Sequence, residues 1–150
     1  DADVKMQKLC AVAESFHSKH GRYPTFWLDK ACIDQSRIGD GLKVLPVNVM
    51  ACSKILVLCG KTYSERLWCG WEIFVNFAFA REELAAERIL LIPLDNTGEA
   101  INKLAHFDAD KASCYDPNEE ARLRLVMEAV SVTQFNSRVR SFAGKIIRES

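Results

Sequence analysis

Glu72 is the residue whose surroundings in this chain most strongly suggest chemistry. It is the only charged residue between Arg66 and Arg81, within the apolar run Trp68-Cys69-Gly70-Trp71-Glu72-Ile73-Phe74. Burying an unpaired carboxylate costs several kcal/mol. Its helical neighbours three and four positions away carry no positive charge. Glu72 must therefore face solvent, meet a distant partner or line a cleft, and the last of these is the functional case.

Two further residues could line the same cleft. Asp29 ends the apolar run Thr25-Phe26-Trp27-Leu28, and Trp68 lies one helical turn before Glu72. Each candidate also has a structural explanation. An acid early in a helix complements the helix dipole, an Asp after a strand caps a loop, and a Trp is more often part of the core.

Composition excludes several other classes of site. Twenty basic and twenty acidic residues give zero net charge, which provides no basis for predicting nucleic-acid or membrane binding and permits self-association.

The six cysteines include no C-x-x-C pair or zinc-ligand spacing. Their even number leaves disulfides open, but their apolar settings favour reduced thiols and a cytoplasmic location. No glycine-rich phosphate loop or nucleophile elbow is present. No apolar stretch approaches the roughly 20 residues of a membrane span.

Hydrophobic periodicity predicts the elements of the first half of the chain. Apolar residues at helical spacing predict a helix over 3–20. The aromatic run 25–28 predicts a buried strand. The polar stretch 30–41 predicts a loop, and residues 42–52 a helix in which Pro46 is tolerated only in the first turn.

The second half continues the alternation of strands and helices. Residues 54–59 form the clearest strand, 60–65 a turn and 67–87 a long helix carrying Glu72. A second apolar strand is predicted over 89–94. The remaining elements are a loop at 95–98, a weak helix over 100–105, a short strand at 112–115, a helix over 117–132 and an amphipathic helix over 133–150.

Apolar strands alternating with helices predict an α/β fold with a parallel sheet covered by helices on both faces. Residues 1–132 would form one domain, with the helix 133–150 packing on it or extending it. Ligands of such sheets bind beyond the carboxyl ends of the strands. Asp29 and Glu72 both follow strands, so they are expected at the same edge of the sheet.

The stretch 26–74 resembles a Toll/interleukin receptor (TIR) domain. It has a strand ending in an acid (Asp29), a variable loop (30–41), and a Ser followed by an apolar strand (Ser53, 55–58). Tyr63 and the Trp68-Cys69-x-x-Glu72-Ile73 pattern resemble the plant-type members of the family. Residues 27–35, Trp-Leu-Asp-Lys-Ala-Cys-Ile-Asp-Gln, are similar to the signature of fungal heterokaryon-incompatibility domains, a TIR-like group.

The resemblance implies a flavodoxin-like parallel sheet. In the family, the first strand precedes the first helix and usually lies near the centre of the sheet. This sequence starts at the helix 3–20, so that strand is expected to be missing from it.

Enzymatic TIR domains cleave the nicotinamide–ribose bond of NAD, releasing ADP-ribose or a cyclic product. The resemblance therefore implies NAD as substrate, Glu72 as the catalytic residue and Asp29, Lys30, Trp68 and Tyr63 around the substrate. A single carboxylate suits this reaction because it stabilises an oxocarbenium-like transition state. No cofactor or metal is implied.

Two alternatives remain open. Many TIR domains are scaffolds in signalling or defence that associate with copies of themselves, and here the assembly loop would include Cys32, Asp34, Gln35, Ile38 and Gly39. A nucleoside deoxyribosyltransferase-like enzyme would also break an N-glycosidic bond with a carboxylate, but the Trp-Leu-Asp and Trp-Cys-x-x-Glu patterns favour the TIR family.

Overall fold

Two parallel strands lie among helices in this chain. The computed structural model describes residues 2–34, 36–78, 81–95 and 97–149, with the backbone alone at 29–30, 38–39, 42, 82–83 and 145–149. Strand β1 (Ile55–Cys59) pairs with β2 (Ile89–Pro93), Ile55 opposite Ile89 and Cys59 opposite Pro93. The two strongest strand predictions and their parallel pairing are confirmed.

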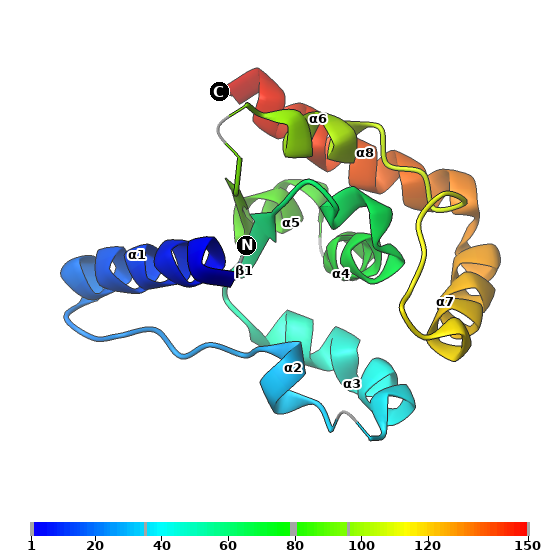
Figure 1. Ribbon diagram of the computed structural model, residues 1–150, viewed down its shortest axis with the longest axis horizontal. Helices are drawn as coiled ribbons and strands as arrows, with labels where there is room; N and C mark the ends of the chain where they lie inside the picture. The colour runs from blue at the N-terminus through cyan, green and yellow to red at the C-terminus, as the bar shows by residue number, and fades with distance from the viewer. Residues whose placement is uncertain (1, 35, 79–80, 96, 150) are drawn as a thin grey trace.

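The helices account for most of the remaining chain (Figure 1). The mixed α/β class is confirmed, but the described residues contain only this two-stranded sheet, which does not establish a flavodoxin-like arrangement. The helices are α1 (Ala2–His20), α2 (Asp29–Cys32), α3 (Ile38–Ala51), the 3-10 helix η1 (Tyr63–Glu65), α4 (Leu67–Ala78), α5 (Glu82–Arg88), α6 (Glu99–Ala105), α7 (Pro117–Val130) and α8 (Val132–Glu149).

Helix α1 is present as predicted, but it contributes no buried residue. Figure 1 shows it at the opposite end of the molecule from α7. Its ring contacts are local: Phe16 lies under the Arg22 guanidinium, and His17 stacks on Tyr23. The amphipathic pattern of α1 therefore predicted a helix correctly without implying that it packs into the core.

The predicted strand over 25–28 is wrong. This segment has no regular secondary structure, and Phe26 and Leu28 are exposed. A strand requires a neighbour for its backbone hydrogen bonds. Here the Leu28 carbonyl, immediately before α2, instead accepts hydrogen bonds from the backbone N–H groups of Ala31 and Cys32 within that helix. Asp29 is thus the first residue of a short helix, not the end of a strand at the sheet edge.

The predicted loop over 30–41 is also partly helical. It contains most of α2, and α3 starts at Ile38, four residues before the predicted start. Pro46 consequently lies inside α3 and not in its first turn. A proline there removes one backbone N–H donor from the helix, a cost that tertiary packing can outweigh. Leu45 and Val49, which flank it, are both buried in the core.

The predicted long helix over 67–87 is two helices, α4 and α5. Arg81, immediately before α5, has an extended backbone with φ −61° and ψ 145°, which ends helical geometry at that point. The Asn76 side chain of α4 donates a hydrogen bond to the Ala85 carbonyl of α5 at 2.7 Å. The predicted strand over 112–115 is reduced to a single parallel bridge between Ser113 and Arg66.

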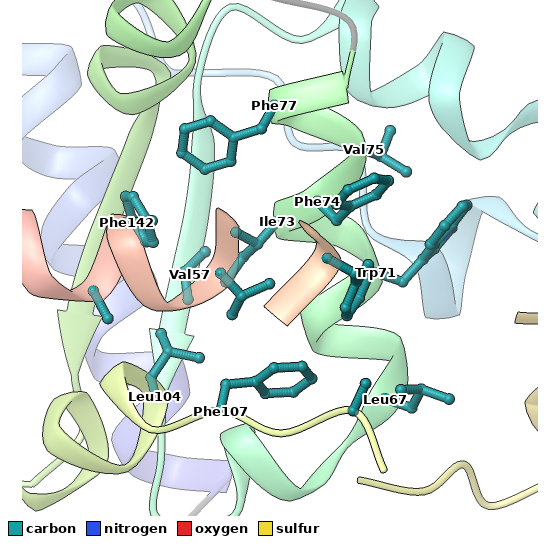
Figure 2. Close-up of a cluster of buried hydrophobic side chains, with 14 of the residues drawn as sticks. Val57, Leu67, Trp71, Ile73, Phe74, Val75, Phe77, Leu104, Phe107 and Phe142 are labelled. Atoms are coloured by element: carbon teal, nitrogen blue, oxygen red, sulfur yellow. The ribbon is translucent and has the colours of Figure 1, made fainter. Parts of the chain in front are cut away.

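Helix α4 is the centre of the hydrophobic core. Nine of its twelve residues are buried, and it packs against α3, α5, α7 and α8. Figure 2 shows Trp71, Ile73, Phe74 and Phe77 of this helix together with Val57 of β1 and Leu104, Phe107 and Phe142 from later segments. Glu72 therefore lies on the helix around which the hydrophobic core is packed.

Two other properties bear on function. Cys10 and Cys32 are exposed free thiols, whereas Cys59 is a buried one. Among the described residues, no helix has both the length and the apolar character that crossing a membrane requires.

Candidate functional site

Glu72 is the sixth residue of α4 and is half-buried between the fully packed residues Trp71 and Ile73. It is the only charged residue of this helix. The helix follows the carboxyl end of β1 through residues 60–66. The prediction that Glu72 lies early in the helix after a buried parallel strand is confirmed, and such a position is where α/β sheets bind ligands.

Tyr63 lies next to the same helix. Its hydroxyl donates a hydrogen bond to the Cys69 carbonyl at 3.4 Å. Burial raises the pKa of Tyr63 well above its usual range, and the neighbouring Cys69 and Glu72 raise it further. The Tyr63 hydroxyl is therefore protonated at neutral pH. The Glu72 charge contributes to that shift, but the hydrogen bond of the Tyr63 hydroxyl is to the Cys69 backbone, three residues before Glu72 on α4.

Trp68 is half-buried and packs against the core. Its indole Nε1 is buried and meets no hydrogen-bond acceptor among the described residues. Buried donors without acceptors are rare in folded proteins, and each one calls for an explanation. Burial is the main cause that raises the pKa of the nearby Cys114 thiol above its ordinary value.

The carboxyl end of β2 is occupied by a structural carboxylate. Asp95 accepts hydrogen bonds from the backbone N–H groups of Gly98 (3.1 Å) and Ala100 (3.0 Å), which orders the start of α6. Burial, together with the nearby Asp95 charge, raises the pKa of Cys59 to about 11. The sheet edge next to Glu72 thus contains a protonated thiol and an acid used for capping.

The remaining predicted site residues lie in segment 29–39. The side chains of Asp29, Lys30, Ile38 and Gly39, and all of Gln35, lie outside the described residues. Ile38 and Gly39 are the first two residues of α3 and therefore do not lie in a loop. Cys32 and Asp34 are exposed. Asp34 accepts hydrogen bonds from the Ser36 backbone (2.9 Å) and hydroxyl (2.7 Å), which lowers the pKa of its carboxyl.

A surface hollow of about 600 Å³ lies away from these residues, along α8. Its lining includes Asn136 and Arg140 together with several small polar residues and none of the predicted site residues. Both named side chains bind the backbone of the segment after α6: Asn136 accepts from Ala109 N–H at 2.9 Å, and Arg140 donates to the Phe107 carbonyl at 2.5 Å. The hollow is thus bordered by groups that hold this segment in place.

Sequence reasoning missed Glu120 and Arg124 of α7. Arg124 donates to Glu120 through Nε (2.9 Å) and Nη2 (2.8 Å), and both side chains also bind the segment 109–114, which contacts the start of α4. The signal was available, because Glu four residues before Arg on a helix is a favourable pair. Within the described residues, no three metal-binding side chains cluster.

Comparison of the chain with protein-family models, curated proteins and solved structures gives no match. The resemblance to TIR domains therefore rests on the motif residues alone.

Proposed function

We propose that this chain is a TIR-like domain that cleaves the N-glycosidic bond of NAD, with Glu72 as the catalytic carboxylate, in a cytoplasmic signalling or defence protein. The observation that carries the proposal is the position of half-buried Glu72, the only charged residue of α4, on the helix that follows the carboxyl end of β1, with the Tyr63 hydroxyl hydrogen-bonded to the Cys69 carbonyl of the same helix.

The reaction needs one negative charge in a fixed position. As the bond between C1′ and the nicotinamide nitrogen breaks, its electron pair leaves with the nicotinamide and positive charge develops on the ribose. Glu72 would hold the ribose hydroxyls and stabilise that charge. Water then bonds to C1′ and loses a proton, giving ADP-ribose. Attack by an adenine nitrogen of the same molecule would give a cyclic product instead.

The test is incubation of concentrated protein with NAD and chromatographic analysis of the products. We expect the parent to release nicotinamide and Glu72→Gln to reduce the rate to background, because the amide keeps the shape but removes the charge. Glu128→Gln is the matched control, since Glu128 is exposed on α7 and distant in sequence from the site. Turnover that persists in Glu72→Gln would contradict the assignment, as would an inactive parent.

A second candidate function is assembly with copies of the same chain, favoured by an apolar surface on α3. Val44 and Val47 are exposed there, on the helix that follows the exposed residues Cys32 and Asp34 of the predicted assembly loop. Zero net charge lowers the electrostatic cost of self-association. The two candidate functions are compatible, because assembly could complete the active site.

Val47→Asp is expected to reduce self-association, because it places a charge in the centre of this apolar surface. The side chain is 68% exposed, so the substitution leaves the core unchanged. Leu125→Asp on α7 is the matched control at 67% exposure. Light scattering across a concentration series measures the mean mass. An equal mass for Val47→Asp and the parent at every concentration would remove α3 from the assembly surface.

A further inference from the structure

The segment between α6 and α7 runs alongside the start of α4. Ser113 N–H donates to the Glu65 carbonyl, and Leu67 N–H donates to the Ser113 carbonyl, both at 3.0 Å. These two bonds form the parallel bridge between Ser113 and Arg66. The first residue of α4 is therefore hydrogen-bonded to Ser113, and Trp68 and Glu72 follow it on the same rigid helix.

Glu120 and Arg124 of α7 fix that segment by its backbone. Arg124 donates to the carbonyls of Ala109 (3.1 Å) and Ala112 (2.9 Å), and Glu120 accepts from Cys114 N–H at 3.0 Å. The two side chains are only 31% and 26% exposed. Hydrogen bonds between ionised groups in such partly buried settings are stronger than those of exposed ion pairs.

Packing removes the remaining freedom between this segment and α4. A methyl group at Gly70 of α4 would lie 2.5 Å from Cζ of the Phe107 ring, so the ring occupies the space where a side chain would be. Phe107 is itself fully buried. The Phe107 ring therefore packs directly against the backbone of α4 at Gly70.

We propose that Glu120 and Arg124 are positioning residues for the α4 site: by fixing residues 109–114 they set the placement of Trp68 and Glu72. The effect of this positioning on catalysis rests on the proposed function. Misplacing a catalytic group by about 1 Å can cost on the order of a hundredfold in rate. Two residues that touch no substrate would therefore have a large effect on turnover.

The first test measures, without any substrate, how well the hydrogen bonds between Ser113 and the start of α4 are protected from exchange. We expect Arg124→Gln to accelerate amide hydrogen exchange at Leu67 and Ser113, as measured by NMR. Arg122→Gln is the control, because Arg122 is an exposed arginine on the same helix. Glu120→Gln is a milder variant that keeps an acceptor for Cys114 N–H and serves if Arg124→Gln does not fold. Parent-like exchange at Leu67 and Ser113 in both variants would overturn the proposal.

The second test is kinetic. We expect Arg124→Gln to lower kcat for NAD cleavage by roughly tenfold to a hundredfold with a smaller change in KM, and Arg124→Lys to recover part of the loss because it keeps the charge. Unchanged kcat alongside faster exchange would overturn the catalytic consequence. An inactive parent would contradict both the catalytic consequence and the proposed function. The exchange result would still decide whether Arg124 holds the segment 109–114 against α4.

Discussion

Replacing Phe135 with alanine is expected to lower the free energy of unfolding by about 3–5 kcal/mol. Phe135 of α8 is fully buried, and its ring lies 4.8 Å from Phe74, 5.9 Å from Phe107 and 6.5 Å from Trp71, measured between centroids. These partners come from α4 and from the segment after α6, so the cavity left by the substitution would open where three parts of the fold meet. Little of it can be filled by relaxation.

Urea unfolding followed by circular dichroism measures this effect. Tyr115→Ala is the control, since Tyr115 is a fully exposed aromatic residue whose truncation should change stability by less than about 0.5 kcal/mol. A loss below about 1 kcal/mol for Phe135→Ala would show that α8 is not part of the core. Because the same cluster supports α4, the variant should also lose any activity that depends on Glu72.

Replacing Arg88 with methionine is expected to cost about 2–3 kcal/mol of stability. Arg88 Nη2 donates to the carbonyls of Val49 (2.8 Å) and Cys52 (2.5 Å) at the end of α3. Arg88 is the last residue of α5, immediately before β2, so its side chain ties the end of α3 to this point of the chain. Removing the guanidinium leaves helix-terminal carbonyls without their charged donor, and these groups require a partner when sheltered from water.

Thermal unfolding compares this variant with Arg122→Met, which removes an exposed arginine from α7 and should leave the midpoint nearly unchanged. Arg88→Lys should be intermediate, because lysine keeps the charge but not the planar guanidinium, whose Nη1 also donates to the Met50 sulfur at 3.3 Å. Equal midpoints for Arg88→Met and the parent would mean that the end of α3 is held by its apolar contacts alone.

The parts of the fold that could be predicted from the sequence are those with a strong local signal. The apolar runs at 55–58 and 89–92 indicated strands without needing their context. Pro117, with Glu119 and Glu120 after it, marked the start of α7. The structure adds a cap there, because the Asp116 carboxylate accepts from Asn118 N–H at 2.8 Å. Segment 25–28 has an equally apolar composition. Whether such a run becomes a strand depends on a pairing neighbour elsewhere in the chain, which composition cannot reveal.

The candidate site was predictable to the same extent. Tyr63, Trp68 and Glu72 lie within ten residues of one another, and their proximity follows from one short turn and one helix. Asp29 was assigned through a strand that does not form. Glu120 and Arg124 act through backbone groups 6–15 residues away in the chain, and these contacts exist only once the segment after α6 is placed.

The absence of buried residues in α1 has a practical consequence for labelling. In the sequence, the exposed thiols of Cys10 in α1 and Cys32 in α2 lie before and after the stretch 21–28, which lacks regular structure. Cys59, by contrast, is shielded by burial and by its raised pKa of about 11, so it is protonated and unreactive at neutral pH. Once the half-buried thiols of Cys52 and Cys114 are replaced by serine, spin labels on the exposed pair would make the distance between α1 and α2 measurable without introducing a new cysteine.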